Sequence, residues 1–175
     1  HYVSRQWMRL ADTPGLAALL YGACRVRTVI EGVAVEIEEI TDYPFDETVR
    51  LVISPAQPTT FTLALRQPGW ASGAAVSVNG IASAPTQRGD LLVIERRWES
   101  GDTVAVSFET EVAAVAYPNG EYAVRRGALQ FVQPIAPAFH ATKHYPNSAL
   151  ADVELWPQDL AQAYRPFFLD AARPG

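Results

Sequence analysis

The stretch FTLALRQPGW, residues 61–70, decides the fold of this chain. Phe61, Leu63 and Leu65 alternate with smaller or polar residues, which is the period of a β-strand with one face toward a core. A Pro-Gly pair ends the strand, and Trp70 follows directly. That tryptophan is either a binding platform at a loop tip or a core residue at a strand end, and the preceding alternation favours the core.

The same alternation recurs along the first 110 residues, and turn-forming residues separate each run from the next. Asn79-Gly80 is a strong signal for a two-residue hairpin turn. No helical period of comparable length lies between the runs. We therefore expect an all-β fold, an antiparallel, jelly-roll-like β-sandwich. The apolar faces expected in one core are those of residues 33–37, 49–53, 61–65, 92–94 and 104–108.

The C-terminal part follows a weaker pattern. Residues 121–135 indicate two strands with a break at Gly127, and the alternation decays from about Pro134. One further strand is expected around residues 153–156, followed by an extended, packed tail. This predicts a β-sandwich domain over residues 1–133 and a C-terminal extension over residues 134–175.

Composition excludes several classes of function. The 175 residues carry a net charge of −5 without any basic run, so a nucleic-acid partner is not expected. No apolar run approaches the length of a membrane span, so no membrane partner is expected either. Because the first residue is His1 and the only methionine is Met8, we expect the chain to start inside a longer gene product. The compartment, bacterial cytoplasm or periplasm, stays open.

The carboxylates predict structure and not catalysis. A glycosidase needs two carboxylates roughly 5–10 Å apart. Glu36 and Glu38, in a cluster with Glu39, share the solvated face of one strand, and Asp42 and Asp46 close a turn. We expect no carboxylate in an apolar pocket that would raise its pKa to make a general acid. No catalytic residue is therefore assigned.

The remaining metal and thiol candidates are weak. His140 and His144 are four residues apart, a spacing that suits a metal pair on a helix, but Thr142 and Pro146 argue against a helix there. No metal site is assigned. Cys24, the only cysteine, is expected to be a buried thiol without a metal or histidine partner.

Exposed aromatics would support a carbohydrate-binding module as the alternative function. The candidates are Trp70, Trp98, Tyr117 and Tyr122. Trp70 and Trp98 each close an alternating apolar run, where an indole usually covers the end of a sandwich core. Burial of these four side chains separates the two interpretations.

Several motifs, taken in order, carry a family resemblance. They are TDYPFDETVRLVIS, FTLALRQPGW, VSVNG, RRWESGDTVAVSF and YAVRRGALQFV. As a set they resemble the region downstream of the catalytic barrel in glycoside hydrolase family 127, the β-L-arabinofuranosidase-type enzymes. The resemblance covers residues 15–133 and continues more loosely into the tail.

The resemblance implies that catalysis and structural support belong to different domains of a longer protein. It places the active site in an (α/α)6-type barrel, with a cysteine nucleophile, a glutamate acid/base and a zinc ion held by cysteines and a glutamate. The family's Cys-Cys signature followed by Pro-Pro-Asn is absent here, and Cys24 does not match it. We therefore expect no cofactor in this chain, with zinc only in the absent catalytic domain. The expected partners are that barrel, which the sandwich would brace, and a second copy in a homodimer.

Overall fold

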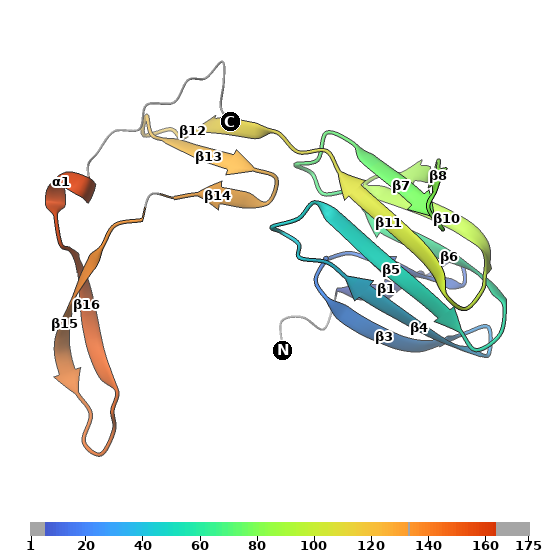
Figure 1. The fold of residues 1–175 in the computed structure, drawn as a ribbon, viewed down its shortest axis with the longest axis horizontal. Coiled ribbons are helices and arrows are strands. Elements are labelled where there is room, and N and C mark those ends of the chain that lie inside the picture. Colours follow the sequence, from blue (N-terminus) through green and yellow to red (C-terminus); the bar gives the residue numbers. More distant parts are fainter. Residues whose placement is uncertain (1–5, 133, 164–175) are drawn as a thin grey trace. The chain divides into compact units, whose positions relative to one another are not determined.

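The computed structural model describes residues 6–132 and 134–163 (Figure 1). These residues form two compact units. The first comprises the chain up to residue 111 together with residues 126–129, and the second comprises residues 112–125 and the chain from residue 130 onward. Residue 133, the end of the predicted sandwich domain, and residues 164–175, the end of the predicted tail, lie outside the described residues.

The first unit is a sandwich of two sheets, with strand orders β1-β2-β6-β10-β9 and β3-β4-β5-β11-β7-β8. Figure 1 shows one sheet lying in front of the other. The predicted all-β sandwich is thus confirmed. The strands are β1 (Trp7–Arg9), β2 (Gly15–Ala18), β3 (Cys24–Ile30), β4 (Val33–Ile40), β5 (Thr48–Pro55), β6 (Thr59–Arg66), β7 (Ala74–Val78), β8 (Ile81–Ser83), β9 (Thr86–Arg88), β10 (Leu91–Trp98) and β11 (Asp102–Phe108).

A single hydrophobic core lies between these sheets and takes side chains from both. Leu51 and Val104 reach it from one sheet, Leu63 and Trp98 from the other, and all four are completely buried. The inward faces predicted from alternation are the faces that the structure buries. Burial of one such aliphatic side chain contributes about 1.5–3 kcal/mol, so the core is the main source of stability.

One pairing departs from the predicted antiparallel arrangement. Strands β2 and β6 run parallel, while every other pairing in the two sheets is antiparallel. The close approach of β2 to β6 depends on Gly15, because a Cβ atom at this position would lie 2.2 Å from the carbonyl oxygen of Thr62. Ala17 and Ala64 are also buried, so the small residues of this pair are covered on both faces. Alternation within one strand carries no information about such a pairing.

Two predicted turns are confirmed in detail. Asn79 and Gly80 have φ angles of 52° and 77°, the positive values that a two-residue hairpin turn needs, and they join β7 to β8. The carbonyl of Asp42 accepts a hydrogen bond from the amide of Phe45 at 2.9 Å. The carboxylate of Asp46 accepts one from the amide of Thr48, also at 2.9 Å.

Two small sheets follow the sandwich strands in the chain, and most of their residues belong to the second unit. Strands β12 (Val112–Ala116), β13 (Tyr122–Arg126) and β14 (Leu129–Phe131) form a three-stranded sheet. Strands β15 (Pro137–His144) and β16 (Ala151–Pro157) form a hairpin, and the short helix α1 (Leu160–Ala163) follows. The predicted strands around Gly127 and residues 153–156 are confirmed, whereas β15 was not predicted.

Candidate functional site

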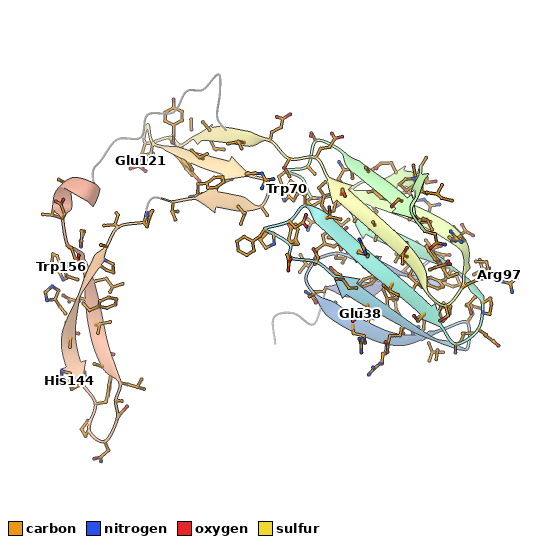
Figure 2. The ribbon with its side chains drawn as sticks, viewed as in Figure 1. Glu38, Trp70, Arg97, Glu121, His144 and Trp156 are labelled. Carbon is orange, nitrogen blue, oxygen red and sulfur yellow. The ribbon has the colours of Figure 1, made fainter. Side chains whose placement is uncertain are left out.

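Four aromatic rings pack together at one end of the sandwich, and we call them the aromatic end cluster. Tyr21 follows β2, Tyr43 lies in the turn between β4 and β5, Trp70 follows β6, and Phe108 ends β11. Tyr43 and Trp70 stack with their centroids 6.4 Å apart, and Phe108 meets Trp70 edge-on at 5.7 Å. Figure 2 shows Trp70 at this end of the sandwich. Such pairs add to the stability that burial itself provides.

A shallow pocket of about 160 Å³ opens beside this cluster. It is lined by residues 19–21, Tyr43, Arg66 and residues 68–70. Ligand pockets usually hold about 300–1,000 Å³, so this one is too small to enclose a disaccharide. It can accept one side chain or the edge of one small ring.

Two polar side chains that line the pocket, Tyr21 and Arg66, already have partners. The hydroxyl of Tyr21 donates to the carbonyl oxygen of Arg66 at 2.6 Å, and burial raises the pKa of this phenol. The guanidinium of Arg66 donates to the carbonyl of Leu19 at 3.4 Å and lies 3.4 Å from the Asp90 carboxylate. Neither group therefore serves as a general base in this arrangement.

Trp70 is held on a further side by the turn between β13 and β14. A Cβ on Gly127 would lie 3.3 Å from the indole, and Gly127 itself has a positive φ of 55°. Arg126 forms an ion pair with Glu47, which also accepts a hydrogen bond from the Thr110 hydroxyl at 3.2 Å. The indole thus anchors a returning turn, which favours a packing role over a sugar platform.

The other sequence candidates for sugar binding are not members of this cluster. Trp98 has 0% exposure, donates from its indole nitrogen to the carbonyl of Phe61 at 2.9 Å, and is covered by Arg96 at 5.1 Å. It offers no surface on which a sugar could stack. Tyr117 and Tyr122 belong to the second unit, where both are exposed, and Tyr117 accepts a hydrogen bond from Arg125 at 2.8 Å.

Glu39 corrects the expectation that no carboxylate lies in an apolar environment. Its side chain is 2% exposed and accepts hydrogen bonds from the Trp7 indole at 2.9 Å and the Gly22 amide at 2.8 Å. Burial raises the pKa of this carboxyl, although its donors oppose the shift. The signal was in the sequence, because the period of two places Glu39 on the same face as Val35 and Ile37.

Cys24 is the third group at this buried carboxylate, and its placement corrects a second expectation. The thiol is half-buried and not fully buried, because β3 is the edge strand of its sheet. It donates to Glu39 at 3.6 Å. Burial and then the charge of Glu39 raise the pKa of the thiol, which is opposite to what a nucleophilic cysteine needs.

The neighbouring carboxylates lie on the solvated face, as predicted. Glu36 pairs with Arg25 and Arg27 across the strands, and Glu38 accepts from Arg25 at 2.7 Å. The hydrogen bond from Arg27 holds the pKa of Glu36 below its usual range. Figure 2 shows Glu38 on the outer face of its sheet. These are cross-strand partners on a wet surface.

The two histidines do not come together. The register pairs His140 with Glu154 and His144 with Ala151, and a bulge lies between Ala141 and Lys143. Glu154 and Ala151 are three positions apart on one regular strand, so the two histidines lie on opposite faces of the hairpin. In the described part of the chain, no three His, Cys, Asp or Glu side chains gather as a metal site. None of the helices described there could span a membrane.

Comparison with known families decides the relationship. The family model described as "Beta-L-arabinofuranosidase, GH127 middle domain" matches residues 15–110, which is more than half of the chain. The chain belongs to this family. The matched residues run from the first strand of the parallel pair to just beyond the last strand of the sandwich, so the family domain is the sandwich itself.

Two solved structures share the fold of this chain. A GH127 β-L-arabinofuranosidase from Geobacillus stearothermophilus T6 is 25% identical, with a TM-score of 0.63 over 85% of this chain and 31% of that one. A second GH127 β-arabinofuranosidase is 24% identical, with a TM-score of 0.60 over 83% of this chain and 28% of that one. The chain therefore spans about a third of the length of these relatives. No curated protein sequence matches it significantly.

The zinc ion that the family resemblance implies does not fit this chain. Such a site needs several cysteines and a glutamate, and Cys24 is the only cysteine in the sequence. The carboxylate of the neighbouring Glu39 already accepts hydrogen bonds from the Trp7 indole and the Gly22 amide. These N–H groups would point their hydrogen atoms at a metal ion bound to the same oxygens, which is unfavourable. Cys24 and Glu39 form a structural network linking β1, β3 and β4.

Proposed function

We propose that this chain is a non-catalytic supporting module of a longer glycoside hydrolase of the β-L-arabinofuranosidase type. The match to the family's middle domain over residues 15–110 carries this proposal. In it, the sandwich braces a catalytic barrel that belongs to the same polypeptide and holds the zinc. A role in homodimerisation is part of the same proposal.

The chemistry of the described residues supports a role other than catalysis. Cleavage of a glycosidic bond needs a positioned acid and a nucleophile or an activated water. The carboxylates Glu36 and Glu38 are solvated and paired with arginines. Glu39 is buried among donors, and the thiol beside it is kept protonated. None of these groups combines an open cleft with a shifted pKa.

The aromatic end cluster is the surface best suited to bracing. Leu20 borders its pocket and is 49% exposed, and Phe45, two residues after Tyr43, is 76% exposed. An apolar rim around a one-side-chain pocket suits a protein contact, in which an apolar side chain of the neighbour fills the pocket. A sugar would need two free, coplanar rings, whereas Trp70 is packed on several sides.

Two assays test the proposal. The purified 175-residue chain should hydrolyse no aryl β-L-arabinofuranoside above the buffer rate, with or without added zinc. The catalytic region of the longer enzyme, expressed without this chain, should be insoluble or unstable, because the apolar surface that the sandwich covers would be exposed. Turnover by the isolated chain that disappears on mutation of one of its residues would contradict the proposal. Binding of an arabinan that Trp70→Ala abolishes without loss of stability would favour the carbohydrate-binding alternative.

A further inference from the structure

The hairpin of β15 and β16 has two chemically different faces. Residues directly opposite each other in an antiparallel pair share a face. The pairs Phe139–Leu155 and Ala141–Val153 therefore lie together, with Pro137–Pro157 beyond them. We call these six residues the apolar hairpin face. His144 and Ala151 continue this face at the turn end.

The opposite face carries complementary charges toward the turn, and the pair Ala138–Trp156 lies at its other end. His140 lies across from Glu154, and Lys143 lies across from Asp152. The hydroxyl of Tyr145 donates to Asp152 at 2.9 Å, and the Lys143 ammonium lies 4.9 Å from the Tyr145 ring. The charged part of this face suits solvent, and the Trp156 indole at its end donates a hydrogen bond to the Glu154 carboxylate at 3.3 Å. The apolar hairpin face does not suit solvent, because Phe139, Val153 and Leu155 are 68%, 50% and 61% exposed.

The apolar face of such a hairpin needs a second layer of protein packed against it. Isolated two-stranded hairpins are at best marginally stable in water, and a hydrophobic face becomes stabilising only when a second layer packs on it. In β16, Val153 and Leu155 alternate with Asp152 and Glu154 before Trp156 interrupts the period. The large side chains of the apolar hairpin face are exposed, so no opposing layer covers them among the described residues of the second unit.

The size of the face decides what covers it. Seven residues at about 3.4 Å each and two strands about 4.8 Å apart give a strip of roughly 240 Å². Two such strips facing each other would bury about 500 Å², well below the roughly 1,200 Å² of a stable interface between free chains. A tethered domain needs much less area, because the linker holds it at a millimolar effective concentration.

We propose that the apolar hairpin face is the docking surface for another domain of the same polypeptide, which packs an apolar surface on Phe139, Val153 and Leu155. The proposal rests on the proposed function, since it takes the chain as part of a longer hydrolase. The solved relatives leave room for such a domain, because this chain covers only 31% and 28% of their lengths.

Cysteine labelling at adjacent positions tests the proposal. In a Cys24→Ser background, Leu155→Cys places a thiol on the apolar face and Glu154→Cys places one on the polar face. Both variants are prepared as the full-length hydrolase and as the 175-residue chain. Labelling is read on the hairpin peptide by mass spectrometry, so other cysteines of the longer chain do not interfere. Val153→Cys and Asp152→Cys form a second matched pair if the first pair expresses poorly.

We expect Leu155→Cys to label about tenfold or more slowly in the full-length protein than in the isolated chain, while Glu154→Cys labels equally in both. Equal labelling of Leu155→Cys in the two proteins would overturn the proposal. Protection that appears in the isolated chain and increases with its concentration would also overturn it, in favour of a second copy. If the catalytic region still requires this chain for solubility while Leu155→Cys labels freely, the supporting role stands and only the hairpin docking fails.

Discussion

Both units of this chain are built from β-strands, but only the first unit buries the apolar faces of its strands. Among the described residues, all of the buried hydrophobic side chains except Ala123 belong to the sandwich. Twelve of the eighteen exposed large hydrophobic side chains lie from Tyr117 onward, in the second unit. The sandwich buries its apolar faces because each sheet covers the other. The difference shows that alternation predicts which face needs a partner, but not whether the partner is in the same unit.

The largest effect on stability is expected when a core indole is removed from the sandwich. We expect Trp98→Ala to lower the free energy of unfolding by about 3–5 kcal/mol, through lost burial and the cavity left behind. The indole also satisfies the Phe61 carbonyl, which the variant leaves without that donor. Thermal or urea unfolding of the isolated chain measures the change.

Arg97→Ala is the matched control for this substitution. Arg97 is exposed at the adjacent position, so its replacement should shift stability by no more than about 0.5 kcal/mol (Figure 2). Equal effects of the two variants would contradict the core assignment.

A smaller loss is expected at the end of the sandwich. Trp70 is half-buried and contacts Tyr43, Phe108 and the turn at Gly127, so Trp70→Ala should cost about 2 kcal/mol. The same unfolding measurement applies, with binding of arabinan followed in parallel. An unchanged melting temperature would show that the indole does not hold the turn, and the packing interpretation would fail.

The buried carboxylate should give the sandwich a pH dependence of a particular sign. Folding raises the pKa of Glu39 above its ordinary value of 4.5, so just above that value the folded state holds a proton that the unfolded state releases. The free energy of unfolding should therefore fall as the pH rises from 4.5 through the raised pKa. Glu36 and Asp102 have lowered pKa values and act in the opposite direction at lower pH.

Comparison of two glutamine variants isolates the contribution of Glu39. Glu39→Gln should remove this part of the pH slope, whereas Glu38→Gln, on the solvated face of the same strand, should retain it. The quantity to compare is the slope of the free energy of unfolding against pH, and not its absolute value. The absolute value also changes because the carboxamide introduced by Glu39→Gln would contact the donors Trp7 and Gly22. Identical slopes in both variants would argue against a buried carboxyl with a raised pKa.

The smallest effect is expected in the second unit. Trp156 is 57% exposed on the polar side of the hairpin, so Trp156→Ala should leave the unfolding of the sandwich unchanged within about 0.5 kcal/mol. Figure 2 shows this side chain on the hairpin. A destabilisation comparable to that of Trp98→Ala would mean that the units share a core, and the comparison would have to be abandoned.

Alternation predicted the sandwich well because a period of two reports directly on burial. It placed Leu51, Leu63 and Val104 in the core, and the turn residues located the hairpin at Asn79. It did not reveal the parallel pairing of β2 with β6, because pairing depends on contacts between distant segments. It also did not reveal β15, where the bulge after Ala141 breaks the period.

The candidate site was predicted less completely. The packing role of Trp70 followed from its position after an apolar run, but its contact with Gly127 depends on a turn far along the chain and has no local signal. Glu36, Glu38 and Glu39 stand close together in the sequence, so composition alone does not distinguish the buried Glu39 from its solvated neighbours. Strict use of the period separates it from Glu36 and Glu38. Polar residues on a buried face are thus the informative exceptions to a regular pattern.

Hydrogen exchange of the backbone amides, in the isolated chain and in the full-length hydrolase, tests the account most directly. The account predicts that the central strands β5, β6 and β11 are equally and strongly protected in both proteins, because the sandwich has its own core. The amides of β15 and β16 should exchange rapidly in the isolated chain and become protected only in the full-length protein. Rapid exchange of the sandwich strands in the isolated chain, or equal protection of the hairpin in both proteins, would contradict the account.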